Sequence, residues 1–221
     1  MSEKGKIFVI DGLDGCGKST QLALAEKRLS EAGHDFITVS FPDYKSDSSA
    51  PVRMYLSGEI APNAEDINAY AASSFYAVDR YISYKTSWEK DYLSGKTVIS
   101  ARYVSSNAIH QMTKLPESEW ESFLRWICDY EYDKLGIPRA DKVIFLDMPM
   151  EVSQKLLSGR YNGDESKKDI HEANIDYLRR CRQAALFAAE RLGWSVIPCS
   201  EDGEPLPVDV ISDKIMSILL S

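Results

Sequence analysis

Residues 12–20 read Gly12-Leu13-Asp14-Gly15-Cys16-Gly17-Lys18-Ser19-Thr20, directly after the apolar run Ile7 to Ile10. This is the G-x-x-x-x-G-K-[ST] pattern of a phosphate-binding loop that follows a strand. The glycines let backbone N–H groups turn toward an anion, the lysine brings positive charge to the outer phosphates, and the serine hydroxyl suits magnesium. Apolar residues then recur at helical spacing from Gln21 to Ala32, before Gly33, so the loop opens a helix whose N-terminus faces the phosphates. The residues expected to hold a nucleotide are Gly12, Gly15, Cys16, Gly17, Lys18, Ser19 and Thr20.

Composition limits the class of protein. The chain has 221 residues, of which 44% are hydrophobic, so it can bury one sizeable core, and we expect a single domain over residues 1–221. The net charge of -8 argues against a protein that coats nucleic acid or an anionic membrane. No apolar run approaches a membrane span or a secretory signal. The four cysteines are scattered without metal-type spacing, which indicates free thiols in a reducing cytoplasm, with Cys16 a small filler of the loop.

Strand-like and helical runs alternate along the chain. Several strand runs are apolar without strict alternation, as expected for strands covered on both faces, so the pattern predicts an α/β, P-loop NTPase fold with a five-stranded parallel sheet flanked by helices. In such sheets ligands bind beyond the carboxyl ends of the strands. The predicted strands are 6–11, 36–41, 97–100, 142–147 and 194–199; the predicted helices are 21–32, 65–93, 117–135, 150–157, 170–192 and 208–220. The polar stretch 158–169 is expected to form a short lid.

The phosphate-binding loop alone does not separate a kinase from a GTPase or a motor ATPase, but the rest of the chain narrows the choice. No N-K-x-D tetrapeptide for reading guanine is present. A series of runs instead resembles the thymidylate kinase family, in that family's order, over about residues 6 to 180. The runs are Asp11 to Thr20, similar to E-G-x-D-G-x-G-K-S-T; Phe41-Pro42; Phe75 to Arg80, similar to F-x-A-[ND]-R; Arg102 to Asn107, similar to D-R-Y-x-x-S-N; and Asp169 to Glu172, similar to D-R-x-E.

This resemblance implies transfer of the γ-phosphoryl group of ATP to dTMP with Mg²⁺. Phe75 is expected to stack on thymine, Arg80 to contact the base or the monophosphate, and Arg102 to bind the monophosphate through its two-pronged guanidinium. In the family, the residues around Asn107 read the thymine edge and crowd the ribose 2′ position. The acceptor residues implied are Asp14, Phe41, Pro42, Phe75, Arg80, Arg102, Ser106, Asn107, His110 and Gln111.

The same resemblance assigns the chemistry. Phosphoryl transfer needs in-line positioning and neutralisation of charge on the γ-phosphate, which Lys18, magnesium and arginine supply. Asp14 is expected to orient the sugar 3′ hydroxyl and, with Ser19, to hold magnesium. Some family members carry a catalytic arginine in the phosphate loop, but Gly15 and Cys16 exclude that here. Arg160 is therefore the expected transition-state arginine, beside Arg102, and Lys167 and Lys168 assist it from the lid.

Two departures from the family pattern matter. Asp43-Tyr44 follows Phe41-Pro42 where many relatives carry an arginine, and Lys45 or Arg53 is a candidate replacement. Ala101 stands where the D-R-Y aspartate belongs, which implies reduced activity, transfer of the role to Asp11 or Asp14, or an altered substrate.

Two alternatives to a dTMP kinase stay open at this point. One is a P-loop kinase for another pyrimidine nucleotide or a deoxynucleoside, and the other is a catalytically weak nucleotide-binding protein. The family commonly dimerises through helices packed face to face, so a homodimer is implied, with the helices at 65–93 and 117–135 as candidates.

Overall fold

The computed structural model describes residues 4–160 and 175–221. Five strands form one sheet in the order β2-β3-β1-β4-β5. β2 runs parallel to β3, with Phe36 opposite Thr97 and Ser40 opposite Ala101, and β4 runs parallel to β5. The predicted α/β fold with a five-stranded parallel sheet is confirmed. The strands are β1 (Ile7–Gly12), β2 (Phe36–Ser40), β3 (Thr97–Ala101), β4 (Lys142–Asp147) and β5 (Ser195–Pro198), and β6 (Ser200–Glu201) pairs antiparallel with β7 (Glu204–Pro205).

The helices follow the predicted order, with corrected boundaries. The longest predicted helix begins at Ala69 rather than Glu65, because the Asn68 side chain caps it by accepting a hydrogen bond from the Ala71 N–H. It then passes through a π-helical turn before it ends at Leu93, and the helix predicted over 117–135 also ends in a π-helical turn. The α-helices are α1 (Lys18–Glu31), α2 (Ala50–Leu56), α3 (Ala69–Ser83), α4 (Glu89–Leu93), α5 (Val104–His110), α6 (Trp120–Cys128), α7 (Met150–Arg160), α9 (Ile175–Leu192) and α10 (Val208–Leu219). The π-helical turns are η3 (Tyr84–Trp88) and η6 (Asp129–Lys134), and the 3-10 turns are η1 (Asp47–Ser49), η2 (Ala64–Asp66), η4 (Met112–Lys114) and η5 (Glu117–Glu119).

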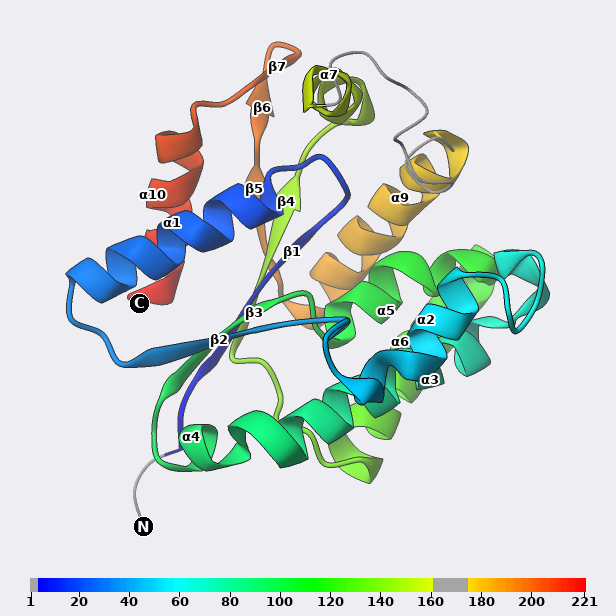
Figure 1. Cartoon of the computed structure of the whole chain (residues 1–221). Coiled ribbons are helices and arrows are strands. Elements are labelled where there is room, and N and C mark those ends of the chain that lie inside the picture. The colour runs from blue at the N-terminus through cyan, green and yellow to red at the C-terminus, as the bar shows by residue number, and fades with distance from the viewer. Residues whose placement is uncertain (1–3, 161–174) are drawn as a thin grey trace. The chain divides into compact units, whose positions relative to one another are not determined.

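The chain divides into two compact units. The first comprises the residues up to Val9 together with Asp35–Asp141, and the second comprises Ile10–His34 together with Lys142–Ser221. The first contains β2, β3 and helices α2 to α6, whereas the second contains α1, β4, β5 and helices α7 to α10 (Figure 1). The expectation of a single domain stays a prediction.

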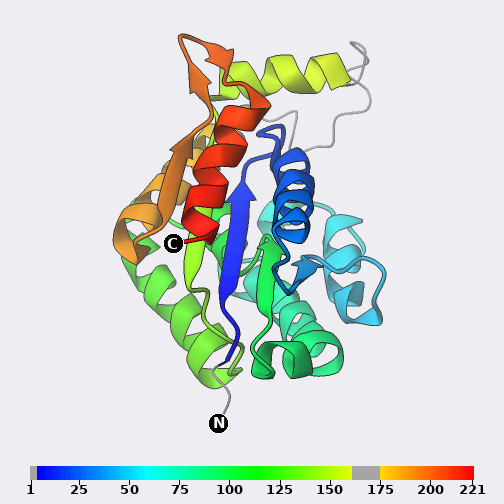
Figure 2. The same cartoon turned by 90° about the vertical axis from the view of Figure 1, so that its left-hand side faces the viewer.

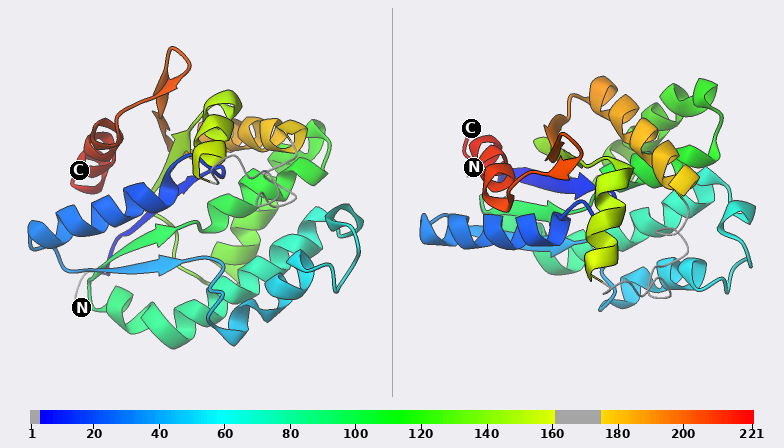
Figure 3. Two further views of the ribbon diagram at one scale, coloured as in Figure 1. Left: turned by 45° about the horizontal axis from the view of Figure 1, so that its top comes forward. Right: turned by 90° about the horizontal axis from the view of Figure 1, so that it is seen from above.

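The first unit is built around the pair β2 and β3, which lie side by side (Figure 3). Helix α5 packs against α6 and α3, and α2 packs against α3. The interior between these helices is apolar: Phe123 and Ile109 are fully buried. This core positions the residues that follow β2 and β3.

The second unit holds the helix that follows the phosphate-binding loop. Helices α1 and α10 pack against each other (Figure 2). Gln21 Nε2 donates to the Val208 carbonyl at 2.9 Å, and Arg28 donates to Ser212 Oγ at 2.9 Å. The buried residues of α1, Gln21, Ala25 and Leu29, recur every four positions, so one face of the helix is covered.

Within the part of the chain that the structure describes, no helix is both long enough and apolar enough to cross a bilayer.

Candidate active site

The phosphate-binding loop connects β1, which ends at Gly12, to α1, which begins at Lys18. Gly15 and Gly17 have φ angles of 78° and 88°, a left-handed conformation that side chains disfavour. These turns bring the chain onto the N-terminus of α1, where backbone N–H groups lack partners within the helix. The loop therefore has the backbone of an anion site.

Gly12 is required by close packing. A Cβ atom there would lie 2.6 Å from Cys16 Sγ and 2.9 Å from the Leu146 carbonyl oxygen. The Cys16 side chain is 2% exposed, so it occupies the space that the glycine leaves. This supports the interpretation of Cys16 as a small filler of the loop.

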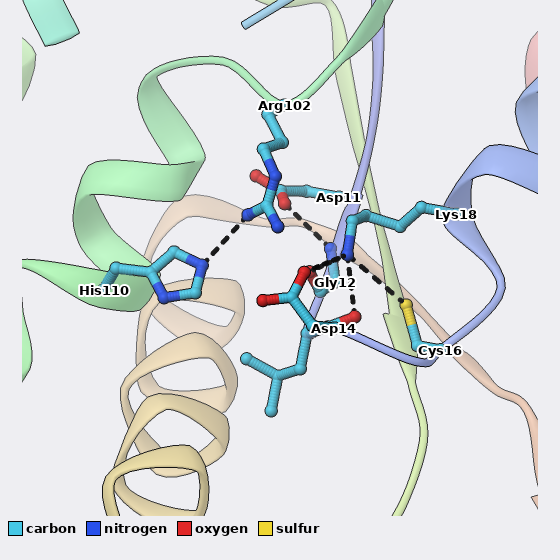
Figure 4. Close-up of polar contacts among 8 residues, drawn as sticks. Asp11, Gly12, Asp14, Cys16, Lys18, Arg102 and His110 are labelled. Carbon is cyan, nitrogen blue, oxygen red and sulfur yellow. Dashed lines mark hydrogen bonds and ion pairs between the residues drawn. The ribbon is translucent and has the colours of Figure 1, made fainter. Parts of the chain in front are cut away.

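Lys18 lies over the loop that it follows (Figure 4). Its Nζ donates to the Gly12 carbonyl at 2.8 Å and to the Leu13 carbonyl at 2.7 Å, and it lies 3.5 Å from Asp14 Oδ1. The ammonium group is thus held where the loop turns, as a phosphate-binding lysine requires. Ser19 and Thr20, the next residues of α1, are exposed.

No described group of three or more His, Cys, Asp or Glu residues is placed to hold a metal ion by itself. Mg²⁺ commonly keeps its waters and takes only one or two protein oxygens beside substrate phosphates. The exposed Ser19 hydroxyl and the partly exposed Asp14 carboxylate are oxygen donors of that kind. This donor set fits magnesium bound together with a nucleotide.

The ends of β2 and β3 bring a second set of predicted residues together, in the first unit. The Phe41 N–H donates to the Ala101 carbonyl at 3.0 Å, so Phe41 and Arg102 leave the sheet as neighbours. The Phe41 ring is buried, 5.9 Å from the Tyr103 ring, and the Phe41–Pro42 peptide is cis. Arg102 has a φ of 63°, and its carbonyl accepts from Ser100 Oγ at 2.6 Å. Backbone strain of this kind at a non-glycine residue points to a functional position.

Arg102 contacts His110 (Figure 4). Arg102 Nη1 lies 3.0 Å from His110 Nε2. Because a guanidinium group only donates, Nε2 is the acceptor and the neutral imidazole carries its proton on Nδ1. His110 thus holds the side chain of Arg102, in addition to any contact with a ligand.

The face of α3 that carries Arg80 also carries Tyr76 rather than Phe75. Residues four apart lie on one side of a helix, whereas Phe75 is five positions from Arg80. Both rings lie near the Tyr55 ring, at 6.0 Å for Phe75 and 6.4 Å for Tyr76. Burial raises the pKa of the Tyr76 phenol, and the positive charges of Arg102 and Arg80 partly offset that rise. Tyr76 is therefore within reach of both arginines. The four-residue spacing between Tyr76 and Arg80 is the sequence signal that places them on one face, and the prediction of Phe75 did not use it.

Arg80 is fully buried in an ion pair with Glu131, a residue that sequence reasoning did not identify. Its Nε and Nη2 donate to the two carboxylate oxygens of Glu131, each at 2.6 Å. Asn107 Nδ2 donates to the same carboxylate at 3.0 Å and to the Ser73 carbonyl at 3.2 Å. Burial lowers the pKa of Arg80, but the charge and hydrogen bonds of Glu131 outweigh that effect and raise it. We call the side chains of Tyr76, Arg80, Arg102, Asn107, His110, Gln111 and Glu131 the α3–α5 cluster.

Two buried polar atoms of this region have no hydrogen-bond partner among the described residues. They are Ser73 Oγ, on the face of α3 that carries Arg80, and Gln111 Oε1, one turn after Asn107. Ser73 is 0% and Gln111 5% exposed. Buried polar atoms are nearly always bonded, so these two are candidates for contact with a ligand. Ser106, between Arg102 and Asn107, is partly exposed.

The predicted lid falls largely outside the structure. Arg160 is the last residue of α7, but its side chain lies beyond the described part of the chain. Lys167, Lys168 and the rest of 161–174 lie outside the described residues. Of the proposed replacements for the missing arginine, Arg53 Nη1 donates to Ser49 Oγ at 2.6 Å, whereas Lys45 is exposed.

Comparisons of the sequence and of the structure with known proteins match thymidylate kinases in each case. The sequence model described as thymidylate kinase matches residues 10–206. A thymidylate kinase of Mycobacterium tuberculosis (strain CDC 1551 / Oshkosh) is 28% identical over 206 residues, which cover 89% of this chain and 92% of that protein. A probable thymidylate kinase of Caldivirga maquilingensis is 27% identical over 195 residues, which cover 88% of this chain and 86% of that protein. A solved thymidylate kinase from Candida albicans shares the fold, with a TM-score of 0.69 at 17% identity over 100% of this chain and 93% of that one.

We expect Asp79→Ala to loosen the segment after β2. The fully buried Asp79 carboxylate accepts from the Asp43 N–H at 2.9 Å and from Ser48 Oγ at 2.5 Å. Removing it takes the acceptor from the partly buried Asp43 N–H and leaves the Ser48 hydroxyl only Ser46 Oγ, at 2.9 Å, which lowers the free energy of unfolding by about 2 kcal/mol. Urea denaturation measures the loss. Asp43→Ala is the matched control, with a change within about 0.5 kcal/mol, because its side chain bonds only the exposed Lys45 N–H in this structure. Equal losses in the two variants would contradict the anchoring role of Asp79.

Proposed function

This chain belongs to the thymidylate kinase family, and we propose that its phosphate-binding loop and α3–α5 cluster together transfer the γ-phosphoryl group of ATP to dTMP. The observation that supports the acceptor most directly is the α3–α5 cluster. It combines an aromatic ring, two arginines and the buried Gln111 Oε1, which has no hydrogen-bond partner among the described residues, in one unit of the chain. The equally buried Ser73 Oγ, on the face of α3 that carries Arg80, also has none there. These groups suit a flat base joined to an anionic phosphate.

On the donor side, backbone N–H groups of residues 12–20 and the ammonium group of Lys18 bind the ATP phosphates. Ser19 and Asp14 would hold Mg²⁺. When bound, the ion neutralises charge on the transferring phosphoryl group and templates its oxygens. Asp14 orients the acceptor hydroxyl rather than abstracting its proton, since phosphoryl transfer depends on positioning more than on a base.

On the acceptor side, Arg102 binds the monophosphate, with His110 fixing its side chain at 3.0 Å. Tyr76 packs on the base, in the role that the sequence assigned to Phe75. Asn107 and Gln111 face the base edge, and Phe41-Pro42 closes the pocket wall. Arg80 acts from its buried ion pair, because its guanidinium keeps N–H donors that Glu131 does not use.

An assay of ADP release tests the function, with dTMP, UMP, dCMP and thymidine compared as acceptors. A dTMP kinase shows its highest kcat/KM with dTMP. Faster turnover of UMP, dCMP or the nucleoside would identify another nucleotide-directed kinase. ATP binding without turnover of any acceptor would identify a nucleotide-binding protein. A homodimer in the cytoplasm that does not bind nucleic acid completes the proposal, supported by the family and by the acidic net charge of -8.

Tyr76→Leu should raise the KM for dTMP by about 5- to 150-fold with little change in the KM for ATP, because it removes a ring contact with the base worth about 1–3 kcal/mol. Phe75→Leu is the neighbouring control and should change the KM for dTMP by less than about threefold. Steady-state kinetics on both variants decides between the rings. A larger effect from Phe75→Leu would restore the original assignment.

Arg160→Ala should lower kcat by roughly a thousandfold and leave ATP affinity nearly unchanged, as expected for an arginine that contacts the γ-phosphate only in the transition state. Single-turnover kinetics and ATP titration separate the two effects. A loss below about tenfold would move the role to Lys167 or Lys168.

Ala101→Asp should lower the magnesium concentration for half-maximal rate and raise kcat, because it restores the aspartate of the family's D-R-Y run and a carboxylate near a metal favours its binding. Ala101 is partly exposed at the end of β3. A magnesium titration of both proteins measures the change. Lower turnover of the aspartate variant at every magnesium concentration would show that the site is built around a small residue.

A further inference from the structure

We propose that Glu131 is a positioning residue that sets the choice of pyrimidine, by holding the Asn107 amide with its oxygen toward the base. The inference rests on the proposed function, in which Asn107 faces the edge of the acceptor base. Glu131 itself is 0% exposed and is engaged by Arg80 and Asn107, so it acts through these neighbours.

One carboxylate joins three elements of the first unit. Glu131 lies on η6, Arg80 on α3 and Asn107 on α5. Glu131 Oε1 accepts from Arg80 Nη2 at 2.6 Å and from Asn107 Nδ2 at 3.0 Å. In this ion pair Glu131 meets Arg80 as a carboxylate, whose oxygens only accept hydrogen bonds.

Both partners of the Asn107 amide nitrogen are therefore obligate acceptors. The second is the backbone carbonyl of Ser73, at 3.2 Å. Turning the amide by half a turn would place its oxygen against a carboxylate and a carbonyl, with no hydrogen between them. The two protons of Nδ2 are thus committed to Glu131 and Ser73, and Oδ1 points away from them as an acceptor.

An acceptor at this place discriminates between pyrimidines. Thymine and uracil carry a hydrogen on N3 and can donate it to Oδ1, whereas N3 of cytosine is itself an acceptor. A pocket with a fixed acceptor leaves two acceptors opposed when cytosine enters, and mismatched buried polar groups of this kind reject a ligand strongly. Glu131 would therefore favour dTMP over dCMP without touching either.

The test removes the hydrogen-bond acceptor at position 131 without leaving Arg80 as a buried, unpaired charge. Glu131→Met alone would leave Arg80 buried and unpaired, which is strongly destabilising, whereas replacing both partners of a buried ion pair is tolerated. We compare Arg80→Met/Glu131→Gln with Arg80→Met/Glu131→Met. Both lack Arg80 and are neutral at 131. Only the first keeps a carbonyl at position 131 that can accept from Asn107. In the second, the Ser73 carbonyl is the one acceptor left to Nδ2 among the described contacts, and the amide is held less firmly.

Calorimetric titration with dTMP and with dCMP gives the affinity ratio of each protein without requiring turnover. The ratio of dTMP to dCMP affinity should be about 2- to 10-fold lower in the variant with Glu131→Met than in the variant with Glu131→Gln, the size expected for one neutral hydrogen bond. Equal ratios in the two variants would overturn the role of Glu131.

The wild-type protein supplies a second measurement should either variant fail to fold. The Asn107 side-chain amide signal in a nitrogen-proton NMR spectrum is assigned by its loss in Asn107→Ala. Both amide protons should exchange slowly with solvent before dTMP is added and stay protected afterwards. Protons that become protected only when dTMP binds would mean that Nδ2 faces the nucleotide, which overturns the proposal.

Failure of the proposed function gives a different result. A wild-type protein that binds dCMP as tightly as dTMP would contradict dTMP as the acceptor, whatever the two double variants show. A selective wild type with equal ratios in the double variants would leave the function intact and remove only Glu131 from it.

Discussion

The bidentate ion pair between Arg80 and Glu131 is the contact on which the α3–α5 cluster depends. Both side chains are removed from water, with exposed fractions of 1% and 0%, so either charge alone would be strongly destabilising. Two 2.6 Å bonds and a third from Asn107 satisfy the carboxylate and offset its desolvation. Because the three residues lie on α3, η6 and α5, the same contact fixes these elements relative to one another within the first unit.

The ends of β2 and β3 show a second constraint of this kind. The Phe41 N–H is bonded to the Ala101 carbonyl at 3.0 Å, so the segments that leave the two strands start from one fixed point. Arg102 then takes a left-handed φ of 63°, which costs of order 1–3 kcal/mol. Its bonds with Ser100 and His110 offset part of that strain. With alanine at 101, the position before Arg102 carries no charge, and the arginine provides the charge at this strand end.

The phosphate-binding loop was predictable from sequence because its structure is set by local residue types. Glycine at 12, 15 and 17 is demanded by close packing or by backbone angles within a few residues. The prediction of Phe75 as the stacking residue stays untested, but its five-residue spacing from Arg80 does not match the helical repeat, whereas the four-residue spacing of Tyr76 does. Glu131 gave no local signal. It lies 51 positions from Arg80, in the charged run Asp129–Lys134, which has the composition of a solvated surface although the fold buries Glu131 within it.

The roles of Glu131 and of the base-facing side chains were harder to predict than the loop for one physical reason. A side-chain amide can present either of its ends, and a flexible arginine can adopt many rotamers, so residue identity does not fix what a pocket offers to a ligand. Buried groups that can only accept remove this freedom before the ligand arrives. In this chain the Glu131 carboxylate and the Ser73 carbonyl orient Asn107, and Glu131 also orients Arg80. The free energy of ordering these side chains is thereby met in folding rather than in binding, and binding can then select one base over another.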